Sequence, residues 1–285
     1  MRLREVSGLL VMLTLVCAAS ALAQQAVRVQ IDGGSPDLKI DIPAQLYRPA
    51  GPGRFAAVAI FHGCGGVGAN NTRMAELLKS WGYVALVVDS FTSRGIKDAC
   101  GRNWPMQADA EKRAIDIDAT SLWLGEQGYV DPKLRTAFMG YSYGGGVGLL
   151  RAFSSRTDIR VPSGWRAAIL VYPDCALADA MGPKLRPRLP TMIAMGEKDD
   201  WTPASQCTAL LDRVTVDRNM VETHIYPDAH HSFDALGLPV RYLEGVGNRS
   251  KPGGCCGAHY GANEAAWNSF TANTKAFLAK HLAPR

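Results

Sequence analysis

The sequence has 285 residues, of which 20% are charged, and its formal net charge is +5. Its 31 lysines and arginines form no basic run, which argues against a nucleic-acid partner. A chain of this length can bury a large core within one domain.

The first 23 residues have the features of a secretory signal peptide. Two arginines precede an apolar run over about residues 9–19, and the sequence Ala-Leu-Ala that ends at Ala23 matches the pattern of a cleavage site. The run is too short for a comfortable membrane span, and a retained anchor is the alternative. We therefore expect cleavage near Ala23, a single mature domain over residues 24–285, a periplasmic or extracellular location, and no stable insertion in a membrane.

Short apolar segments alternate with amphipathic ones along the rest of the chain. Strands are expected at residues 39–47, 55–61, 84–88, 136–139, 167–172, 191–195 and 221–226. Helices are expected at residues 72–81, 107–126, 143–153, 204–214 and 263–281, with a long glycine-rich loop at 236–261. Segments that are apolar throughout are typical of strands buried on both faces of a parallel sheet. The alternation predicts an α/β fold with a mostly parallel central sheet and helices on both faces.

A serine stands between two glycines where an expected strand ends and an expected helix begins, in the sequence GYSYG at residues 140–144. The pattern Gly-x-Ser-x-Gly in this context is typical of a nucleophile elbow, a sharp turn that presents a reactive serine. The alternative is a glycine-rich packing turn whose serine caps the helix. We expect Ser142 to be a nucleophile, which requires a base to take its proton.

Candidates for the acid and the base follow two later strands. Asp199 and Asp200 come after the sixth expected strand, and His230 and His231 come after the seventh. The carboxyl ends of the strands of an open α/β sheet meet at the edge where ligands bind. The chain order Ser, Asp, His is that of the α/β-hydrolases. Asp199 is favoured as the acid and Asp200 as a turn or capping residue, while the choice between the two histidines stays open at this point.

A site of this kind also needs N–H donors for the developing oxyanion. One should be the N–H of Tyr143, the residue after the nucleophile, and the other should come from the loop after an earlier strand. The sequence FHGCGG at residues 61–66 is well placed for this, and the Cys64 N–H is the candidate. His62 is expected to be structural.

Six cysteines remain after the signal peptide, and an even number in an exported protein favours disulfides. Six cysteines allow fifteen pairings, so spacing alone does not give the connectivity. Positions after expected strands are compatible with two of these pairs, Cys175–Cys207 and Cys64–Cys100. The adjacent cysteines at 255 and 256 favour a vicinal or loop-closing disulfide over a metal site with His259.

Together these segments resemble the dienelactone hydrolase family of the α/β-hydrolases. The resemblance covers about residues 39–281 and is carried by FHGCGG (61–66), DSFTSRG (89–95), GYSYGGG (140–146), GEKDDWTP (196–203) and AHHSFD (229–234). It implies an α/β-hydrolase fold with a Ser-His-Asp triad. The family pattern G-x-x-D matches Asp199, and a histidine directly before Ser/Gly-Phe matches His231.

Two features depart from the family's name-giving enzymes. Those enzymes have a cysteine at the position of Ser142, and they hold a substrate carboxylate with arginines. Arg94 lies near the position of one such arginine. The other arginine is absent, and Asp234 and Ala235 occupy its place. The resemblance therefore implies a serine esterase rather than an enzyme for dienelactone itself.

We therefore expect an exported serine hydrolase that cleaves small carboxylic esters through an acyl-enzyme on Ser142, without a cofactor or metal. Candidates for contacting the substrate are Arg94, Tyr141 and Trp201. A surface ion pair is the alternative role for the arginine, and plain packing is the alternative for the two aromatic residues. The alternative functions are a peptidase or acyltransferase with the same triad, or a non-catalytic binding protein. The sequence predicts neither the natural substrate nor the oligomeric state.

Overall fold

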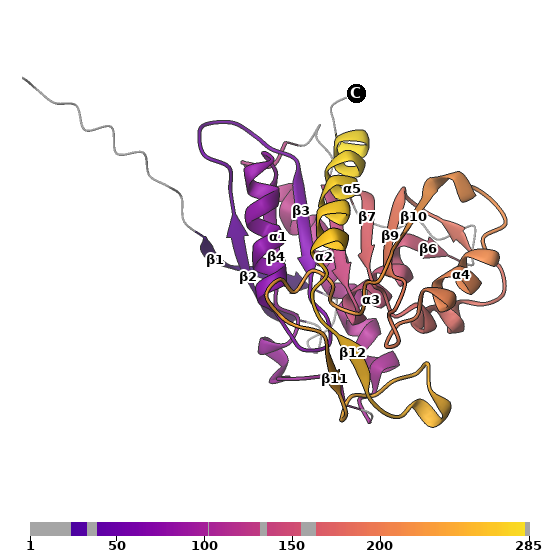
Figure 1. The fold of residues 1–285 in the computed structure, drawn as a ribbon. Helices are drawn as coiled ribbons and strands as arrows, with labels where there is room; N and C mark the ends of the chain where they lie inside the picture. The colour runs from indigo at the N-terminus through magenta and orange to yellow at the C-terminus, as the bar shows by residue number, and fades with distance from the viewer. Residues whose placement is uncertain (1–23, 33–38, 102, 132–135, 155–163, 283–285) are drawn as a thin grey trace, which may run out of the picture.

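The computed structural model describes residues 24–32, 39–101, 103–131, 136–154 and 164–282. The expected signal peptide, residues 1–23, lies outside the described residues. The described part of the chain is built around one large twisted sheet with helices on both faces (Figure 1).

In the described residues the central sheet has eight strands, in the order β1-β2-β4-β3-β5-β7-β9-β10. Their bounds are β1 (Gln25–Asp32), β2 (Lys39–Tyr47), β3 (Ala57–Phe61), β4 (Val84–Val88), β5 (Thr136–Tyr141), β7 (Trp165–Val171), β9 (Thr191–Gly196) and β10 (Val221–Tyr226). The strands from β4 to β10 pair in parallel, whereas β1 and β2 join one edge antiparallel. The predicted mostly parallel sheet is therefore confirmed.

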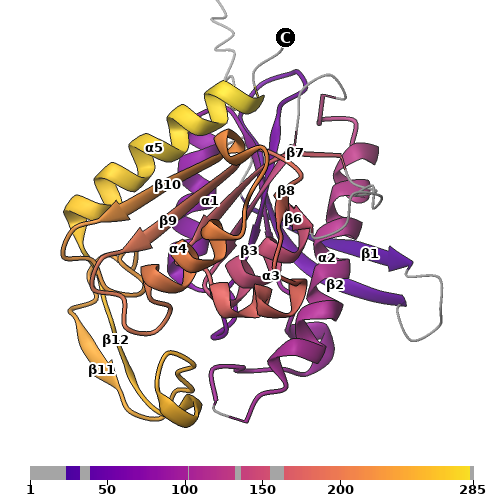
Figure 2. The ribbon, with the colours of Figure 1, turned by 90° about the vertical axis from the view of Figure 1, so that its right-hand side faces the viewer.

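Helices cover the two faces of this sheet. They are α1 (Ala69–Ser80), α2 (Met106–Glu126), α3 (Tyr143–Ala152), α4 (Ala204–Asp212) and α5 (Glu264–Leu282). Phe138 of β5 packs in a core with α2, α3 and α4, and its neighbour Met139 packs in a second core with α1 and α5. Helices α2, α3 and α4 therefore cover one face of the sheet, and α1 and α5 cover the other (Figure 2). Because both faces are covered, β3, β4, β5 and β9 are buried along their whole length. Within the described residues, no helix combines the length and the apolar character needed to cross a membrane.

Besides the two-residue strands β6 (Phe153–Ser154) and β8 (Arg186–Pro187), which pair antiparallel, two features differ from what the sequence predicts. The first is β1, which pairs with β2 over residues 25–32 at the edge of the sheet. Its mixed polar and apolar residues give a weak signal because an edge strand does not need to be apolar on both faces. The second is a small hairpin, β11 (Arg241–Leu243) and β12 (Ala258–Tyr260), inside the expected loop. Strands of three residues are too short to show a period.

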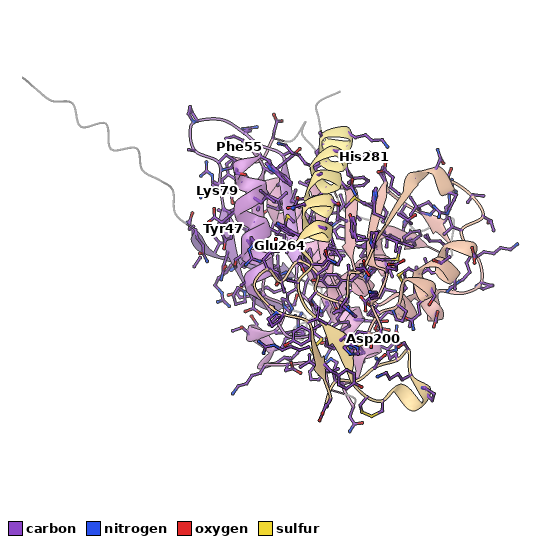
Figure 3. All side chains as sticks on the ribbon, viewed as in Figure 1. Tyr47, Phe55, Lys79, Asp200, Glu264 and His281 are labelled. Carbon is purple, nitrogen blue, oxygen red and sulfur yellow. A yellow bond between two sulfur atoms is a disulfide. The ribbon has the colours of Figure 1, made fainter. Side chains whose placement is uncertain are left out.

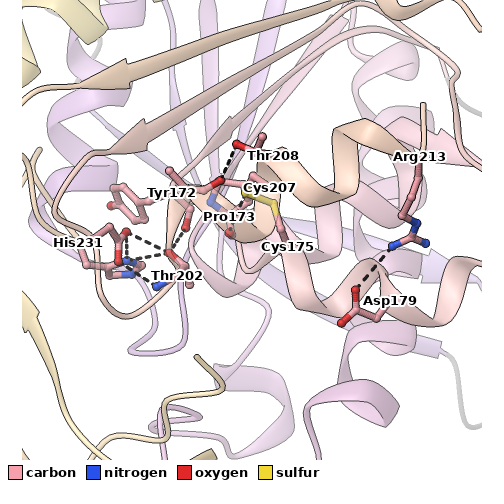
Figure 4. Close-up of a disulfide and its surroundings, with 11 residues drawn as sticks. Tyr172, Pro173, Cys175, Asp179, Thr202, Cys207, Thr208, Arg213 and His231 are labelled. Carbon is pink, nitrogen blue, oxygen red and sulfur yellow. Dashed lines mark hydrogen bonds and ion pairs between the residues drawn. A yellow bond between two sulfur atoms is a disulfide. The ribbon is translucent and has the colours of Figure 1, made fainter. Parts of the chain in front are cut away.

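Disulfides tie down loops at the C-terminal edge of the sheet. The structure joins the cysteines as Cys64–Cys100, Cys175–Cys207 and Cys255–Cys256. The first two are the pairs that the sequence suggests, and their Cα atoms lie 5.0 and 5.1 Å apart. Cys64 lies in the loop after β3, and Cys175 begins the short helix after β7. Figure 4 shows the second bridge close to the residues of the candidate site.

Candidate active site

Ser142 lies in the turn between β5 and α3, and its backbone is strained. Its φ of 53° and ψ of −116° fall in a region that residues other than glycine seldom adopt. Glycines make the turn possible, because a Cβ on Gly140 would overlap the Gly144 carbonyl and one on Gly144 would overlap the His62 carbonyl. A sharp strand-to-helix turn of this kind has the backbone geometry of the nucleophile elbow that the sequence predicts.

A chain of hydrogen bonds connects three buried side chains at the C-terminal edge of the sheet. His231 Nε2 lies 2.9 Å from Ser142 Oγ, and His231 Nδ1 lies 2.8 Å from Asp199 Oδ2. The three residues follow β5, β9 and β10, so the parallel strands bring them to one place. When Nδ1–H donates to the carboxylate, Nε2 is left to accept the proton of the serine hydroxyl.

The Asp199 carboxylate is held by its own loop. Its Oδ1 accepts the N–H groups of Trp201 and Thr202, each at 2.9 Å. The Thr202 hydroxyl lies 3.0 Å from Oδ2 and 3.1 Å from His231 Nδ1 (Figure 4). The sequence pattern does not single out Thr202 for this contact. The carboxylate therefore has one orientation, in which Oδ2 faces the imidazole.

Two aromatic rings hold the His231 ring between them. The Tyr172 ring centroid lies 4.5 Å from that of His231, and the Trp201 centroid lies 4.8 Å from it. The Tyr172 hydroxyl donates to Asp234 at 2.8 Å, and Asn70 donates to the other carboxylate oxygen at 3.0 Å. The buried Asp234 thus anchors Tyr172. Sequence reasoning did not single out Tyr172.

Two backbone segments meet beside the Ser142 hydroxyl. Tyr143 is the first residue of α3, so its N–H has no acceptor within the helix. The loop after β3 passes close by, because a Cβ built on Gly63 would stand 3.3 Å from Ser142 Cβ and 3.8 Å from its Oγ. Cys64 comes next in this loop and is fixed by its disulfide and by the bond that its carbonyl accepts from the Ala99 N–H at 2.8 Å. The two expected oxyanion donors therefore belong to the segments that flank the serine.

His62 is buried beneath this loop and has structural partners. Its Nδ1 lies 2.7 Å from the Gly63 carbonyl, its Nε2 accepts the Ser90 N–H at 3.2 Å, and its own carbonyl accepts from Arg113 at 2.7 Å. Burial, followed by the positive charge of Arg113, lowers the pKa of His62 to about 3. The ring is therefore neutral in the folded protein at ordinary pH, which fits the structural role expected for it.

We expect His62→Gln to flatten the pH dependence of the free energy of unfolding in the acid range. Folded His62 stays neutral down to about pH 3, whereas the imidazole of the unfolded chain takes up a proton below about pH 6.5. The folded protein therefore keeps its full stability with respect to His62 above about pH 6.5. As the pH falls from there toward 3, protonation of the unfolded chain lowers the free energy of unfolding by roughly 1 kcal/mol per pH unit. Urea unfolding of both proteins at about pH 7.5, 5.5 and 4.5 measures this. A difference between them that stays constant with pH would contradict the expectation.

A cavity of about 280 Å³ lies beside Ser142 and is open to a small ligand. Trp201, Trp104 and Met106 form apolar parts of its wall, together with the Cys64–Cys100 disulfide. Its charged lining residues, within the described chain, are Asp174 and Arg249. Of the three candidates for contacting the substrate, Trp201 therefore lines the cavity.

The other two candidates have different surroundings. Arg94 makes two hydrogen bonds of 2.6 and 2.7 Å to the buried Asp116 of α2, and it does not line the cavity. This replaces both expected roles, because the partner is neither a substrate anion nor a surface carboxylate: buried Asp116 needs a counter-charge. Tyr141 is 1% exposed and donates to Met139 Sδ in the core under α1 and α5, so it packs rather than shaping the cavity.

Asp200 has a different task from its neighbour Asp199. Its carboxylate accepts the His259 N–H at 2.8 Å and lies 2.8 Å from His259 Nδ1, and its carbonyl accepts from Asn248 at 2.8 Å. These bonds attach the segment that contains β11 and β12 beside the site, where Figure 3 labels Asp200. Trp201 Nε1 adds a bond of 2.9 Å to the Gly247 carbonyl in the same segment. This attachment is the reason that Asp200 is not available to His231.

Comparisons with known proteins agree with this architecture. The model of the dienelactone hydrolase family matches residues 42–280. A dienelactone hydrolase from Anabaena variabilis is 19% identical, with a TM-score of 0.62 over 91% of this chain and 98% of that one. Esterase 2 of Thermogutta terrifontis, phosphorylated by paraoxon, is 18% identical, with a TM-score of 0.63 over 92% and 96%. None of the curated proteins matches the chain.

The solved structures show the fold alone, because their sequence identity is low. The family match covers most of the chain, including the elbow and the segments that carry Asp199 and His231. The chain belongs to the dienelactone hydrolase family, and it is a carboxylic-ester hydrolase.

Proposed function

We propose that the protein hydrolyses small carboxylic esters through an acyl-enzyme on Ser142. His231 is the base, and Asp199 is the carboxylate that orients it. The observation that carries the proposal is the hydrogen-bonded chain from Ser142 Oγ through His231 to Asp199. Its distances of 2.9 and 2.8 Å are within the reach that proton transfer requires.

In the first half of the reaction, Ser142 Oγ attacks the carbonyl carbon of the ester as His231 Nε2 takes its proton. The carbonyl oxygen becomes an oxyanion, which the N–H groups of Tyr143 and Cys64 stabilise. The Asp199 carboxylate holds the imidazole in position and stabilises its positive charge. The tetrahedral intermediate then collapses, and the alcohol leaves with the proton from Nε2.

In the second half, water takes the place of the alcohol. His231 Nε2 accepts a proton from the water as its oxygen attacks the acyl carbon. The acid is released, and the proton returns to Ser142 Oγ. The net reaction is ester plus water to acid plus alcohol, and each proton that the imidazole accepts is given back within the same half.

We also propose that the chain is exported, with residues 24–285 as one mature domain. The signal-like sequence up to Ala23 supports this. So do the disulfides Cys64–Cys100 and Cys175–Cys207, because such bridges persist in oxidising compartments.

A fluorophosphonate probe tests the proposed function, because it phosphonylates an activated serine. The esterase from Thermogutta terrifontis has been captured phosphorylated by paraoxon, and we expect Ser142 of this protein to react in the same way. The mature protein should take up one label, mapped to Ser142 by mass spectrometry, and its hydrolysis of p-nitrophenyl acetate should fall in proportion to the label. A folded sample with neither label nor turnover would rule the proposal out.

A further inference from the structure

The cavity beside Ser142 has a charged end that the proposed triad does not use. Asp174 follows β7, and its N–H donates to the Ser142 carbonyl oxygen at 3.2 Å, which fixes it to the elbow. Arg249 comes from the segment between β11 and β12. The Asp174 side chain is 9% exposed and that of Arg249 is 43% exposed, so a buried carboxylate meets an arginine that solvent reaches.

The contact between these two side chains is looser than that of a buried ion pair elsewhere in the protein. One nitrogen of Arg249 lies 3.3 Å from Asp174 Oδ2, and a second lies 3.4 Å from the Ala176 carbonyl. Arg94 instead holds Asp116 with two bonds of 2.6 and 2.7 Å. Short bidentate bonds satisfy both partners, whereas long single contacts leave donor and acceptor capacity for a ligand.

The neighbours of Asp174 offset only part of the cost of burying its charge. Burial raises the pKa of Asp174, and the charge of Arg249 and a backbone hydrogen bond from Ala176 oppose that rise without cancelling it. A further hydrogen-bond donor next to a buried carboxylate is favourable, because a buried polar group with unused capacity costs free energy. A hydroxyl group of a ligand supplies such a donor and can accept from the guanidinium through its oxygen.

Aromatic surface lies next to this polar end. Trp104 and Trp201 both line the cavity. The bond from Trp201 Nε1 to the Gly247 carbonyl, at 2.9 Å, fixes the orientation of its ring. A pyranose ring, with hydroxyl groups around its rim and an apolar C–H face, matches both parts of such a wall.

We infer that the charged end of the cavity binds hydroxyl groups in the alcohol half of the substrate, and that the substrates are esters of sugars or similar polyols. The inference rests on the proposed hydrolysis at Ser142. One hydroxyl donates to Asp174, a neighbouring hydroxyl accepts from Arg249, and the C–H face of the ring packs on tryptophan. An alcohol half that carries a net charge fits less well, because Asp174 repels a carboxylate and Arg249 repels an ammonium group.

Four acetate esters test this, because all of them form the same acetyl-enzyme and differ only in the alcohol half. They are methyl 6-O-acetyl-glucopyranoside, cyclohexylmethyl acetate, acetoxyacetate and acetylcholine, with acetic acid release followed in a pH-stat. The wild type should have a kcat/KM for the sugar ester about tenfold or more above that for the cyclohexylmethyl ester, which lacks hydroxyls. The anionic and cationic esters should both be poorer substrates than the sugar ester.

Variants locate the preference. Asp174→Asn and Arg249→Gln should each lower the ratio of kcat/KM for the sugar ester to that for the cyclohexylmethyl ester by about tenfold. The ratio cancels any common effect on the triad. The control is Asp217→Asn, which breaks an exposed ion pair of 2.8 Å with Arg186 outside the cavity and should keep the wild-type ratio.

A wild-type ratio near one, or a preference for acetoxyacetate or acetylcholine, would overturn the substrate class and leave ester hydrolysis standing. The same holds if the wild type prefers the sugar ester but both variants keep its ratio. Failure to hydrolyse any of the four, together with p-nitrophenyl acetate, would overturn the proposed function and the inference with it.

Discussion

Ser142→Ala should lower kcat for p-nitrophenyl acetate by about 10⁴- to 10⁶-fold. The methyl group of alanine provides no nucleophile, and the remaining rate comes only from binding the ester next to the oxyanion donors. The variant should also take up no fluorophosphonate label. Both quantities are measured on protein whose folding is checked by its thermal transition.

The matched control for this serine is Ser205→Ala. Ser205 is exposed in the first turn of α4, so losing its hydroxyl should leave kcat unchanged. If Ser142→Ala retained more than about a hundredth of the wild-type kcat, the proposed nucleophile would be wrong. Reactivity would then have to be sought at another side chain that lines the cavity.

Asp199→Asn should lower kcat by about 10⁴-fold. The N–H groups of Trp201 and Thr202 demand an acceptor at the Oδ1 position, so the amide oxygen of the asparagine will take that place. Its NH₂ group then faces His231 Nδ1 and donates to it. The imidazole is forced into the tautomer that carries its proton on Nε2, where it is unable to accept the proton of Ser142.

Asp200→Asn is the natural comparison, because it removes the charge of the adjacent carboxylate. Asparagine can still accept the His259 N–H through its oxygen, so kcat should fall by less than about tenfold. A larger loss in Asp200→Asn than in Asp199→Asn would reverse the assignment of the acid. Thermal transitions of both variants separate a loss of chemistry from a loss of folding.

The parts of the fold that the sequence predicts are those with a local signal. The runs AVAIF and VALVV form β3 and β4, and both are buried throughout, so their composition alone identifies strands covered on two faces. Because parallel strands end at one edge, positions after strands predict a site that holds Ser142, Asp199 or Asp200, and His230 or His231. The choice of His231 follows only from the resemblance to the family. The same positions are compatible with the pairs Cys64–Cys100 and Cys175–Cys207 but do not single them out.

The remaining parts depend on which side of an element faces inward. Arg94 has acidic residues nearby in the sequence, but its partner Asp116 lies on the buried side of α2, which a short amphipathic pattern does not single out. Tyr172 reaches His231 because β7 and β10 lie on either side of β9 and end at the same edge of the sheet. Such contacts depend on register and twist, which single-chain periodicity does not encode.

The attachment of Asp200 to His259 affects how this protein can diversify. The segment that contains β11 and β12 forms part of the wall of the cavity, and it is bonded to Asp200, the residue next to Asp199. The side chain of Arg249 contacts Asp174, whereas its neighbours Asn248 and Ser250 donate to the Asp200 carbonyl. A substitution of the Arg249 side chain can therefore alter what the cavity recognises without removing a bond to Asp200. Insertions or deletions that displace His259 would instead pull on the loop that orients Asp199. Selection can therefore vary the Arg249 side chain, while Asn248, Ser250 and His259 stay constrained by their bonds to Asp200.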